Sequence, residues 1–349
     1  MRYIFFTLLV LACHKTEIVA QTSPSITYDP ATRNYLLRFQ GEAGLVEVVF
    51  EPPTKVEPTI ECNIFPDAIS SSLTYSYRVR NGASAKQRLI SFSVRADVPE
   101  GYIDTPNAQW TKHKRYAQNL VTWAHTKANI YGVLTGFNGI PPDSIARGFM
   151  FRSTGLPVIT LSYSQGAVKT MSFPEEPPPE IDSLLTPLQV FPNNSVSRET
   201  IGPKQPSAPF DATIFLDTLL SYTRQSAELG WLGRDRDNDC DNDEKPEDGI
   251  VRNIDHRLNK AKRQLERGDS VLARRELEKL VGKVERLWKR SQDDEERKHG
   301  KDRKNWWQRD KGDHVVMTSE AYALLKYNTE YLIDRLPDRK PKKGSKDRD

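Results

Sequence analysis

The first half of the chain alternates apolar and polar residues with the period of two that is typical of β-strands. The run from Leu73 to Val79 is the clearest case, and Asn81-Gly82 after it favours a hairpin turn. Ile90, Phe92 and Val94 then alternate in the expected return strand. Further short strands are expected at residues 35–39, 46–50, 120–123, 149–151 and 158–163. Proline and glycine clusters separate these runs, so residues 25–173 are predicted to form a β-sandwich.

After Pro209 the apolar residues recur at steps of three and four, which is typical of amphipathic helices. Four such stripes are found, at residues 215–220, 251–265, 273–288 and 321–336. Asp211 is the expected N-cap of the first helix, and Pro337 ends the last one. The predicted fold class is therefore multidomain, all-β and then all-α: a β-sandwich followed by a small helical bundle at residues 210–337.

A proline-rich stretch separates the two halves. In Glu175-Glu176-Pro177-Pro178-Pro179-Glu180 the prolines stiffen the chain and the acids keep it hydrated. Residues 174–209 are therefore predicted to be a linker between separate domains, although an apolar patch at residues 184–191 is expected to dock on a neighbour. Residues 338–349 are expected to be a basic disordered tail.

The N-terminus has the pattern of a signal peptide. Met1-Arg2 precedes an apolar run of about ten residues, too short to span a bilayer as a helix. We expect a signal peptide at residues 1–20 with cleavage after Ala20. The alternative is Val10-Leu11-Ala12-Cys13, which resembles a bacterial lipobox and would make Cys13 a lipidation site. The protein is accordingly expected to be secreted or at the cell surface, periplasmic or extracellular, with a lipoprotein as the alternative.

Composition fits a soluble, folded chain of 349 residues, with 37% apolar and 28% charged residues. The net charge of +4 hides an uneven distribution. Residues 235–248 hold 8 acidic and 2 basic side chains, whereas the rest of the chain from Phe210 holds 30 basic and 22 acidic ones. Three cysteines do not make a disulfide framework. Cys62 and Cys240 are expected to be free thiols, buried or without a chemical role. The alternative is a disulfide between them.

An acidic loop offers the one candidate metal site. Carboxylates at every second position of a loop can converge on Ca²⁺, which takes six to eight oxygen ligands. The candidate ligands are Asp237, Asp239, Asp241, Asp243 and Asp248, and Ca²⁺ is the only cofactor that the sequence suggests. Lys245 at the ninth place and Asp at the twelfth depart from an EF-hand loop. The alternative is a hydrated, self-repelling loop between helices.

Trp306 and Trp307 lie among basic residues, and exposed aromatic rings beside cations can stack on sugars. The alternative is that the pair packs onto the bundle. A cell-wall polymer or an anionic glycan is the expected partner. Nucleic acid is not expected for an exported protein, and membrane contact is expected only through a lipid anchor. Catalytic signals fail, because Ser162-Tyr163-Ser164-Gln165-Gly166 lacks the first glycine and the following helix of a nucleophile elbow.

Two resemblances complete the prediction. The stretch from Ile140-Pro141-Pro142 through Leu156-Pro157 resembles a pattern of bacterial secreted β-sandwich modules, which implies a non-catalytic Ig-like or fibronectin-like fold. Leu265-Glu266-Arg267-Gly268-Asp269, with the apolar positions of the four stripes, resembles the FIMAH-type helical domain of secreted bacterial proteins. That resemblance implies an accessory or attachment role and brings no catalytic residues.

The favoured hypothesis is an exported, non-enzymatic accessory, binding or attachment protein of a bacterial cell surface or the extracellular space. The alternative is a secreted enzyme of the hydrolase type, with an unusual site in the loops of the sandwich.

Overall fold

The computed structural model describes residues 23–67, 70–96, 102–115, 119–125, 139–169, 171–233, 249–299 and 317–337. Within these ranges the chain forms two compact units. The first unit contains the described residues up to Pro52 together with Met171–Val190. The second unit contains the described residues of Pro53–Thr170 and of Phe191–Asp349.

The first unit is a small antiparallel sheet covered by one helix. Its strands, in the order β1-β2-β3, are β1 (Ser25–Asp29), β2 (Asn34–Gly41) and β3 (Gly44–Phe50). Alternate residues of the sheet point to one face, where they pack against α1 (Pro179–Gln189). The buried residues of this core are Leu37, Phe39, Val48, Phe50, Ile181 and Leu185. The apolar patch predicted to dock on a neighbour is therefore largely a helix that covers a sheet formed some 130 residues earlier.

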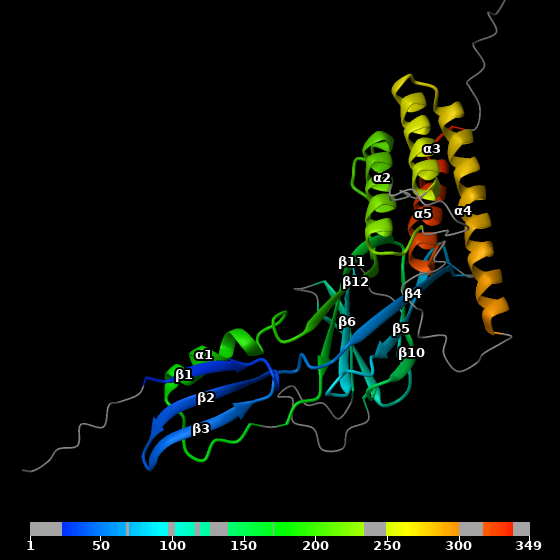
Figure 1. Cartoon of the computed structure of the whole chain (residues 1–349). Helices are drawn as coiled ribbons and strands as arrows, with labels where there is room; N and C mark the ends of the chain where they lie inside the picture. Colours follow the sequence, from blue (N-terminus) through cyan, green and yellow to red (C-terminus); the bar gives the residue numbers. More distant parts are fainter. Residues whose placement is uncertain are drawn as a thin grey trace, which may run out of the picture. The chain divides into compact units, whose positions relative to one another are not determined.

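The second unit contains a sandwich of two sheets (Figure 1). One sheet has the order β4-β5-β10-β7, with bounds β4 (Pro58–Pro66), β5 (Leu73–Asn81), β10 (Ser144–Ser153) and β7 (Ile103–Asp104). The other has the order β12-β11-β6-β9-β8, with bounds β12 (Val196–Lys204), β11 (Leu156–Gly166), β6 (Leu89–Arg95), β9 (Leu120–His125) and β8 (Trp110–Arg115). Large aromatic side chains fill the space between the sheets: Tyr75, Tyr77, Phe92, Trp123, Phe149 and Phe151. The predicted β-sandwich is confirmed, although β1 to β3 form their own sheet outside it.

The hairpin predicted at Asn81-Gly82 is wrong. β5 and β6 lie in different sheets, so the chain crosses the sandwich between them. The Asn81 side chain stabilises this crossing, because it is fully buried and its Nδ2 donates to the carbonyls of Gln87 and Ile140. A buried amide that bonds three backbone groups, including the Glu57 N–H, outweighs the local preference of Asn-Gly for a tight turn.

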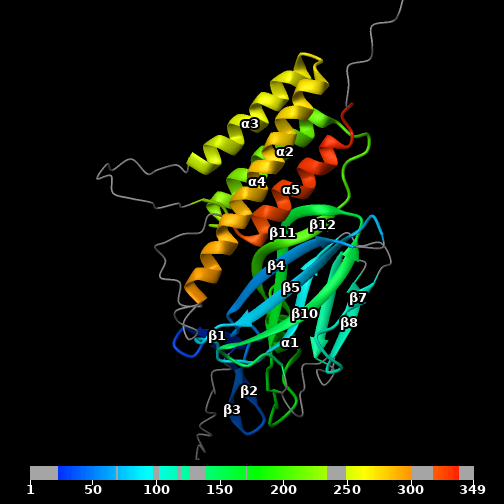
Figure 2. The same cartoon turned by 90° about the vertical axis from the view of Figure 1, so that its right-hand side faces the viewer.

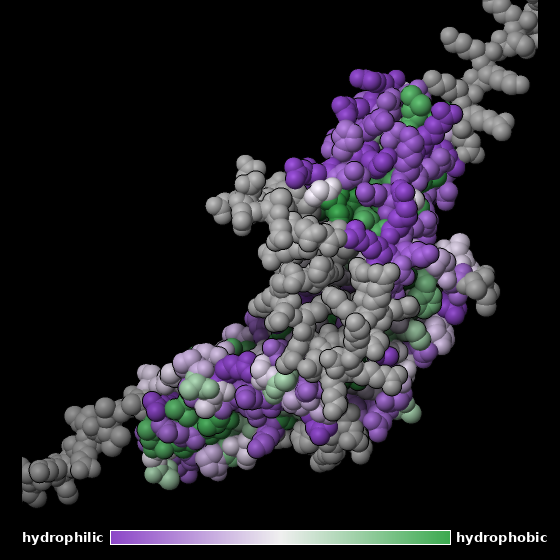
Figure 3. Space-filling view, turned by 45° about the vertical axis from the view of Figure 1, so that its right-hand side comes forward, coloured by the Kyte–Doolittle hydropathy of each residue, from purple (hydrophilic) through white to green (hydrophobic). Residues whose placement is uncertain are grey.

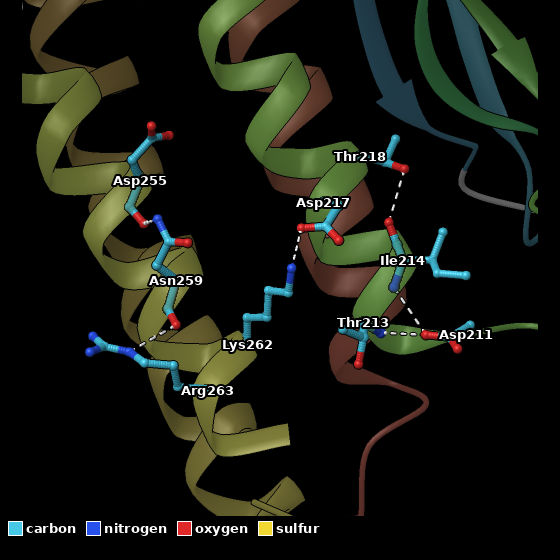
Figure 4. Close-up of polar contacts among 9 residues, drawn as sticks. All are labelled: Asp211, Thr213, Ile214, Asp217, Thr218, Asp255, Asn259, Lys262 and Arg263. Carbon is cyan, nitrogen blue, oxygen red and sulfur yellow. Dashed lines mark hydrogen bonds and ion pairs between the residues drawn. The ribbon is translucent and has the colours of Figure 1, made fainter. Parts of the chain in front are cut away.

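Four helices follow, as the apolar stripes predict: α2 (Ala212–Glu228), α3 (Gly249–Glu266), α4 (Ser270–His299) and α5 (Ser319–Ile333). Asp211 caps α2, since its Oδ1 accepts the N–H groups of Thr213 and Ile214 (Figure 4). The same view shows Lys262 of α3 paired with Asp217 of α2 at 2.6 Å. The turn between α3 and α4 is tight, with Gly268 at φ +75. None of the described helices combines the length and the apolar character that a membrane crossing requires.

α5 belongs to two hydrophobic cores at once. Ala323, Leu324 and Tyr327 pack in the core of the sandwich, whereas Ala321, Leu325 and Leu332 pack in the core of the bundle. Ten of its fifteen residues are buried, so the helix is apolar or shielded nearly all round. The bundle and the sandwich therefore share one helix instead of being joined only by the chain between them.

The predicted linker at residues 174–209 is consequently corrected. Residues 179–189 form α1, and residues 196–204 form β12, which pairs with β11 from Leu156 opposite Lys204 to Ser164 opposite Val196. Proline content favoured a spacer, but Pro179 lies at the start of α1 and Pro203 near the end of an outer strand, where a missing N–H costs little. Pro187 lies inside α1, which forms in spite of it.

Polar side chains of α5 complete the hydrogen bonding of the sandwich. Glu320 Oε1 accepts the N–H of Cys62 at 2.6 Å, and Tyr327 Oη donates to the carbonyl of Ile64 at 3.0 Å. Both partners lie on β4, an edge strand whose outer backbone groups would otherwise lack partners. Asn328 Nδ2 donates to the carbonyl of Pro157 at 2.8 Å, and Pro157 stands opposite Pro203, which has no N–H to offer.

Replacing Asn328 by leucine should destabilise the second unit by about 1–3 kcal/mol, because it leaves the buried Pro157 carbonyl without a donor. The measurement is urea unfolding followed by circular dichroism. Thr329→Val is the matched control on the next position of α5. The Thr329 hydroxyl is buried and has no hydrogen-bond partner among the described residues, so this change should be neutral or stabilising. Equal losses in both variants would contradict the role given to Asn328.

Glu320 is a buried carboxyl group with an elevated pKa. Burial raises the pKa, the Cys62 N–H opposes this rise, and the carboxylate of Glu61 adds to it. Because the pKa of the folded state is raised, the contribution of Glu320 to stability is complete below the unfolded-state pKa. That contribution is lost as the pH rises through the folded-state pKa.

We therefore expect Glu320→Gln to raise the melting temperature at pH 8, because the raised pKa of Glu320 lowers the stability of the wild-type protein above the ordinary pKa of a glutamic acid. The difference should shrink as the pH falls below the ordinary pKa of a glutamic acid. Thermal unfolding from pH 3.5 to 8 measures this, with the exposed Glu199→Gln in β12 as the control. A variant that is less stable at pH 8 than at pH 4, relative to wild type, would show that the sign is wrong.

Candidate functional site

The described part of the bundle carries a concentration of positive charge where α3 and α4 lie side by side (Figure 2). At its centre is Glu276 of α4, whose side chain is only 9% exposed. Lys260 of α3 and Lys279 of α4 each place Nζ 3.0 Å from Glu276 Oε1. Arg257 of α3 places Nη1 3.6 Å from Oε2. One carboxylate therefore faces three cations, and the cluster keeps an excess of two positive charges.

The electrostatic environment of Glu276 follows from this arrangement. Burial alone would raise the pKa of the Glu276 carboxyl, but the hydrogen bonds from Lys260 and Lys279 outweigh it, and the pKa lies below its ordinary value. The side chain is thus held as a carboxylate at neutral pH. The cations around it remain accessible, since the Lys260 and Lys279 side chains are 45% and 59% exposed.

Further cations continue the cluster along α4. Residues three, four or seven apart lie on the same side of a helix, so Arg275, Lys279, Lys283 and Arg286 share the side on which Lys279 meets Glu276. Arg286 lies eleven positions after Arg275, which corresponds to about 16 Å along the helix. These four residues, with Arg257 and Lys260 of α3, are called the α3–α4 cationic surface below.

Two acids within the same stretch of α4, Glu278 and Glu285, do not neutralise this surface, because each has its own partner. Glu278 pairs with Arg274 at 3.1 Å, and Glu285 pairs with Lys326 of α5 at 2.6 Å. Both lie toward the α5 side of α4, since Lys326 is on α5 and Arg274 donates to the carbonyls that end that helix. The charges of α4 are thus segregated, with paired acids toward α5 and excess cations toward α3. Figure 3 shows the strongly hydrophilic character of the helical surface.

Such a surface can bind an extended anion. Its cations are spread along about 16 Å of α4, a length that suits a linear polymer with repeated charges better than a single small ion. Lysine ammonium groups act as point charges that tolerate varied anion geometry, and arginine adds planar donors. Partly exposed cations retain attraction for an incoming anion within about 10 Å at ordinary salt.

All the site residues predicted from the sequence lie outside the described residues. These are the calcium loop of Asp237, Asp239, Asp241, Asp243 and Asp248, the pair Trp306 and Trp307, the lipidation site Cys13 and the cleavage site after Ala20. Cys240 lies outside them as well, so a pair with Cys62 stays untested. Cys62 itself is buried, and burial raises the pKa of its thiol well above the ordinary value, with a further rise from Glu320.

The residues of the rejected nucleophile elbow are ordinary strand residues. Ser162 lies within β11, and its Oγ donates to the carbonyl of Arg198 on the neighbouring strand β12. The described ranges contain no group of three or more His, Cys, Asp or Glu side chains placed to hold a metal ion.

Comparison with known proteins finds one solved structure and no family. No protein-family model matches the chain, and no curated protein is significantly similar to it. Among solved structures, an uncharacterized protein from Nocardia farcinica with an immunoglobulin-like fold is similar at 13% identity and a TM-score of 0.25. The similarity covers 40% of this chain and 95% of that chain. The description as a sandwich followed by helices rests on the sheets and helices of the chain itself.

The sequence held a signal for the α3–α4 cationic surface that composition alone did not locate. Net basic charge after Pro209 was evident, but not its place. The signal is the spacing, with bases at 275, 279, 283 and 286 at steps of three and four along α4.

Replacing Glu276 by glutamine should lower stability by about 1 kcal/mol at pH 7, because three cations lose their common counter-charge. The folded-state pKa of Glu276 is lowered. Its stabilising contribution is therefore present above the unfolded-state pKa and is lost as the pH falls through the folded-state pKa. The difference in stability between wild type and variant should be larger at pH 7 than at pH 3. Glu278→Gln, which removes one exposed pair, should have the smaller effect.

Proposed function

We propose that the protein is an exported, non-enzymatic binding or attachment protein of a bacterial cell surface, and that its helical bundle binds an anionic polymer. The observation that carries the proposal is the excess of cations on the α3–α4 surface, where Glu276 is the single acid among six bases. The acids that could neutralise it are engaged elsewhere on α4.

The arrangement of the second unit supports an attachment role. α5 is packed into both the sandwich and the bundle, so force applied to the bundle is transmitted to the sandwich through buried contacts. A flexible tether would not provide this. The resemblance of the helical half to the FIMAH-type domain agrees with an accessory role in secreted proteins.

The signal-like N-terminus supports export, and it directs the choice of ligand. Anionic polymers outside bacterial cells include phosphodiester-linked wall polymers and acidic glycans. The spacing of cations along about 16 Å of α4 suits a chain that carries a charge on each repeat. The candidate calcium loop and the Trp306–Trp307 pair remain further parts of this proposal.

The test is a binding titration of the full chain without residues 1–20, using poly(glycerol phosphate), heparin and neutral dextran as probes. Both anionic polymers should bind, and dextran should not. Affinity should fall by about tenfold or more between 50 and 300 mM NaCl, because the attraction is screened. Failure of both anionic polymers to bind at 50 mM NaCl would refute the proposal.

Variants locate the binding. The double variant Lys283→Gln, Arg286→Gln should weaken binding by at least about tenfold, since it removes two cations that no acid neutralises among the described ion pairs. The matched control is Lys262→Gln, Lys326→Gln, which removes the same charge from residues already paired with Asp217 and Glu285. The control should change the affinity by less than about threefold. Equal effects would show that only net charge matters.

A further inference from the structure

The outer edge of β3 in the first unit is open. In the sheet order β1-β2-β3 this strand pairs only with β2, so every second residue directs its N–H and C=O away from the sheet. Within the described residues, these outward backbone groups of Gly44–Phe50 make no hydrogen bond to another segment. An edge of this kind is a template for pairing with another strand.

The edge strands of the two sandwich sheets are protected, and β3 is not. β4 is covered by α5, β12 contains Pro203, and β7 has only two residues. β8 presents Lys112 and Lys114, and lysine on an edge discourages pairing. β3 has seven residues without proline, lysine or a bulge in its pairing with β2.

Exposed apolar side chains accompany the open edge. Leu45 and Val49 of β3 are 56% and 57% exposed on the face of the sheet opposite α1. Figure 3 shows hydrophobic residues at the surface of this unit. Large apolar side chains left in water beside unpaired backbone groups indicate an interaction surface.

The sequence of β3 identifies the partner, because its pattern is nearly symmetric about Glu47. Leu45 and Val49 stand two residues away on either side and point to the outer face, and Val46 and Val48 stand one residue away and point to the inner face. In an antiparallel pair centred on Glu47, Leu45 faces Val49 of the other copy, and Val46 faces Val48. Each apolar residue then faces an apolar residue of the other copy on the same face of the sheet, and the two copies contribute the same surface, as an isologous interface requires.

The charge at the centre is compatible with this pairing. Two Glu47 carboxylates would meet at the two-fold axis, but Arg38 of β2 holds Glu47 at 2.6 Å and stands directly opposite it in the register. The row across four strands then reads Arg38, Glu47, Glu47, Arg38, so each acid keeps its counter-charge.

We propose that the protein forms a homodimer in which the β3 strands of two copies pair antiparallel about Glu47 and join two three-stranded sheets into one of six strands. The contact adds a ladder of backbone hydrogen bonds and removes Leu45 and Val49 from water. Its area is small compared with obligate dimers, so the dimer is expected to dissociate in the micromolar range.

The decisive test is disulfide trapping in the full chain without residues 1–20 and with Cys240→Ser. In the Glu47→Cys variant the two introduced thiols oppose each other with Cα atoms about 4.5–5.5 Å apart, within the range of a disulfide. It should cross-link on mild oxidation. Val49→Cys places its sulfur opposite Leu45 of the other copy, and the second introduced thiol lies about 13 Å away along the strand. It should not cross-link. Equal trapping at both positions, or none at position 47, overturns the proposal.

Sedimentation equilibrium provides a second measurement. The chain should be dimeric at about 100 µM, and the variant Leu45→Lys, Val49→Lys should be monomeric with an unchanged circular dichroism spectrum. The control is Thr27→Lys on the exposed face of β1, at the opposite edge of the same sheet, which should stay dimeric. A monomeric wild-type chain at this concentration, or equal loss of the dimer in the control, contradicts the model.

Discussion

The burial of α5 in two cores is the constraint on which the rest of the second unit depends. A helix with one apolar stripe can serve a bundle or a sheet, but it cannot serve both. α5 serves both because small and apolar residues cover most of its circumference, and because its polar residues bond backbone groups of the sandwich. Those bonds go to an edge strand and to a carbonyl opposite a proline, two places where the sheets cannot satisfy themselves. The sandwich therefore depends on the last helix of the chain for complete hydrogen bonding.

The cationic surface follows from the same constraint. α4 packs against α5 on one side and α3 on the other, and its acids lie toward α5, where Lys326 and Arg274 meet them. The bases left over lie toward α3, with Glu276 buried among them. Glu276 offsets part of the repulsion between the helices, and it leaves an excess of positive charge at the surface. Arg257, Lys260 and Lys279 thus stabilise the helix pair through Glu276 and also belong to the surface offered to a ligand.

Much of the fold was predictable, because periodicity reports which face of an element is buried. Seven strands (β2, β3, β5, β6, β9, β10 and β11) and the four helices follow from alternation and from apolar stripes, and the Asp211 cap follows from residue type. The errors concern contacts between distant segments. Nothing local to Pro179 or Val196 indicates that one segment covers β2 and the other pairs with β11. The hairpin prediction at Asn81-Gly82 was wrong for a similar reason. The buried side chain of Asn81 bonds the carbonyls of Gln87 and Ile140, and the dipeptide alone does not indicate these contacts. The cationic surface could not be located from the sequence, because it depends on the packing of α3 against α4. The spacing of bases along one helix does not show which helix lies beside it.

If both proposals hold, pairing at the open edge of β3 raises the affinity of the cationic surface for a polymer, and polymer binding promotes the pairing. A single surface of partly exposed lysines and arginines binds weakly, because each exposed charge contributes little and salt screens it. Two surfaces joined through a β3 dimer would make the second contact with the same polymer an intramolecular event, which raises the overall affinity without any new contact. Weak pairing at β3 is then sufficient, because a polymer that holds two copies close together also promotes their dimerisation. Polymer binding and dimerisation are thus linked equilibria, and each should strengthen the other by the same factor.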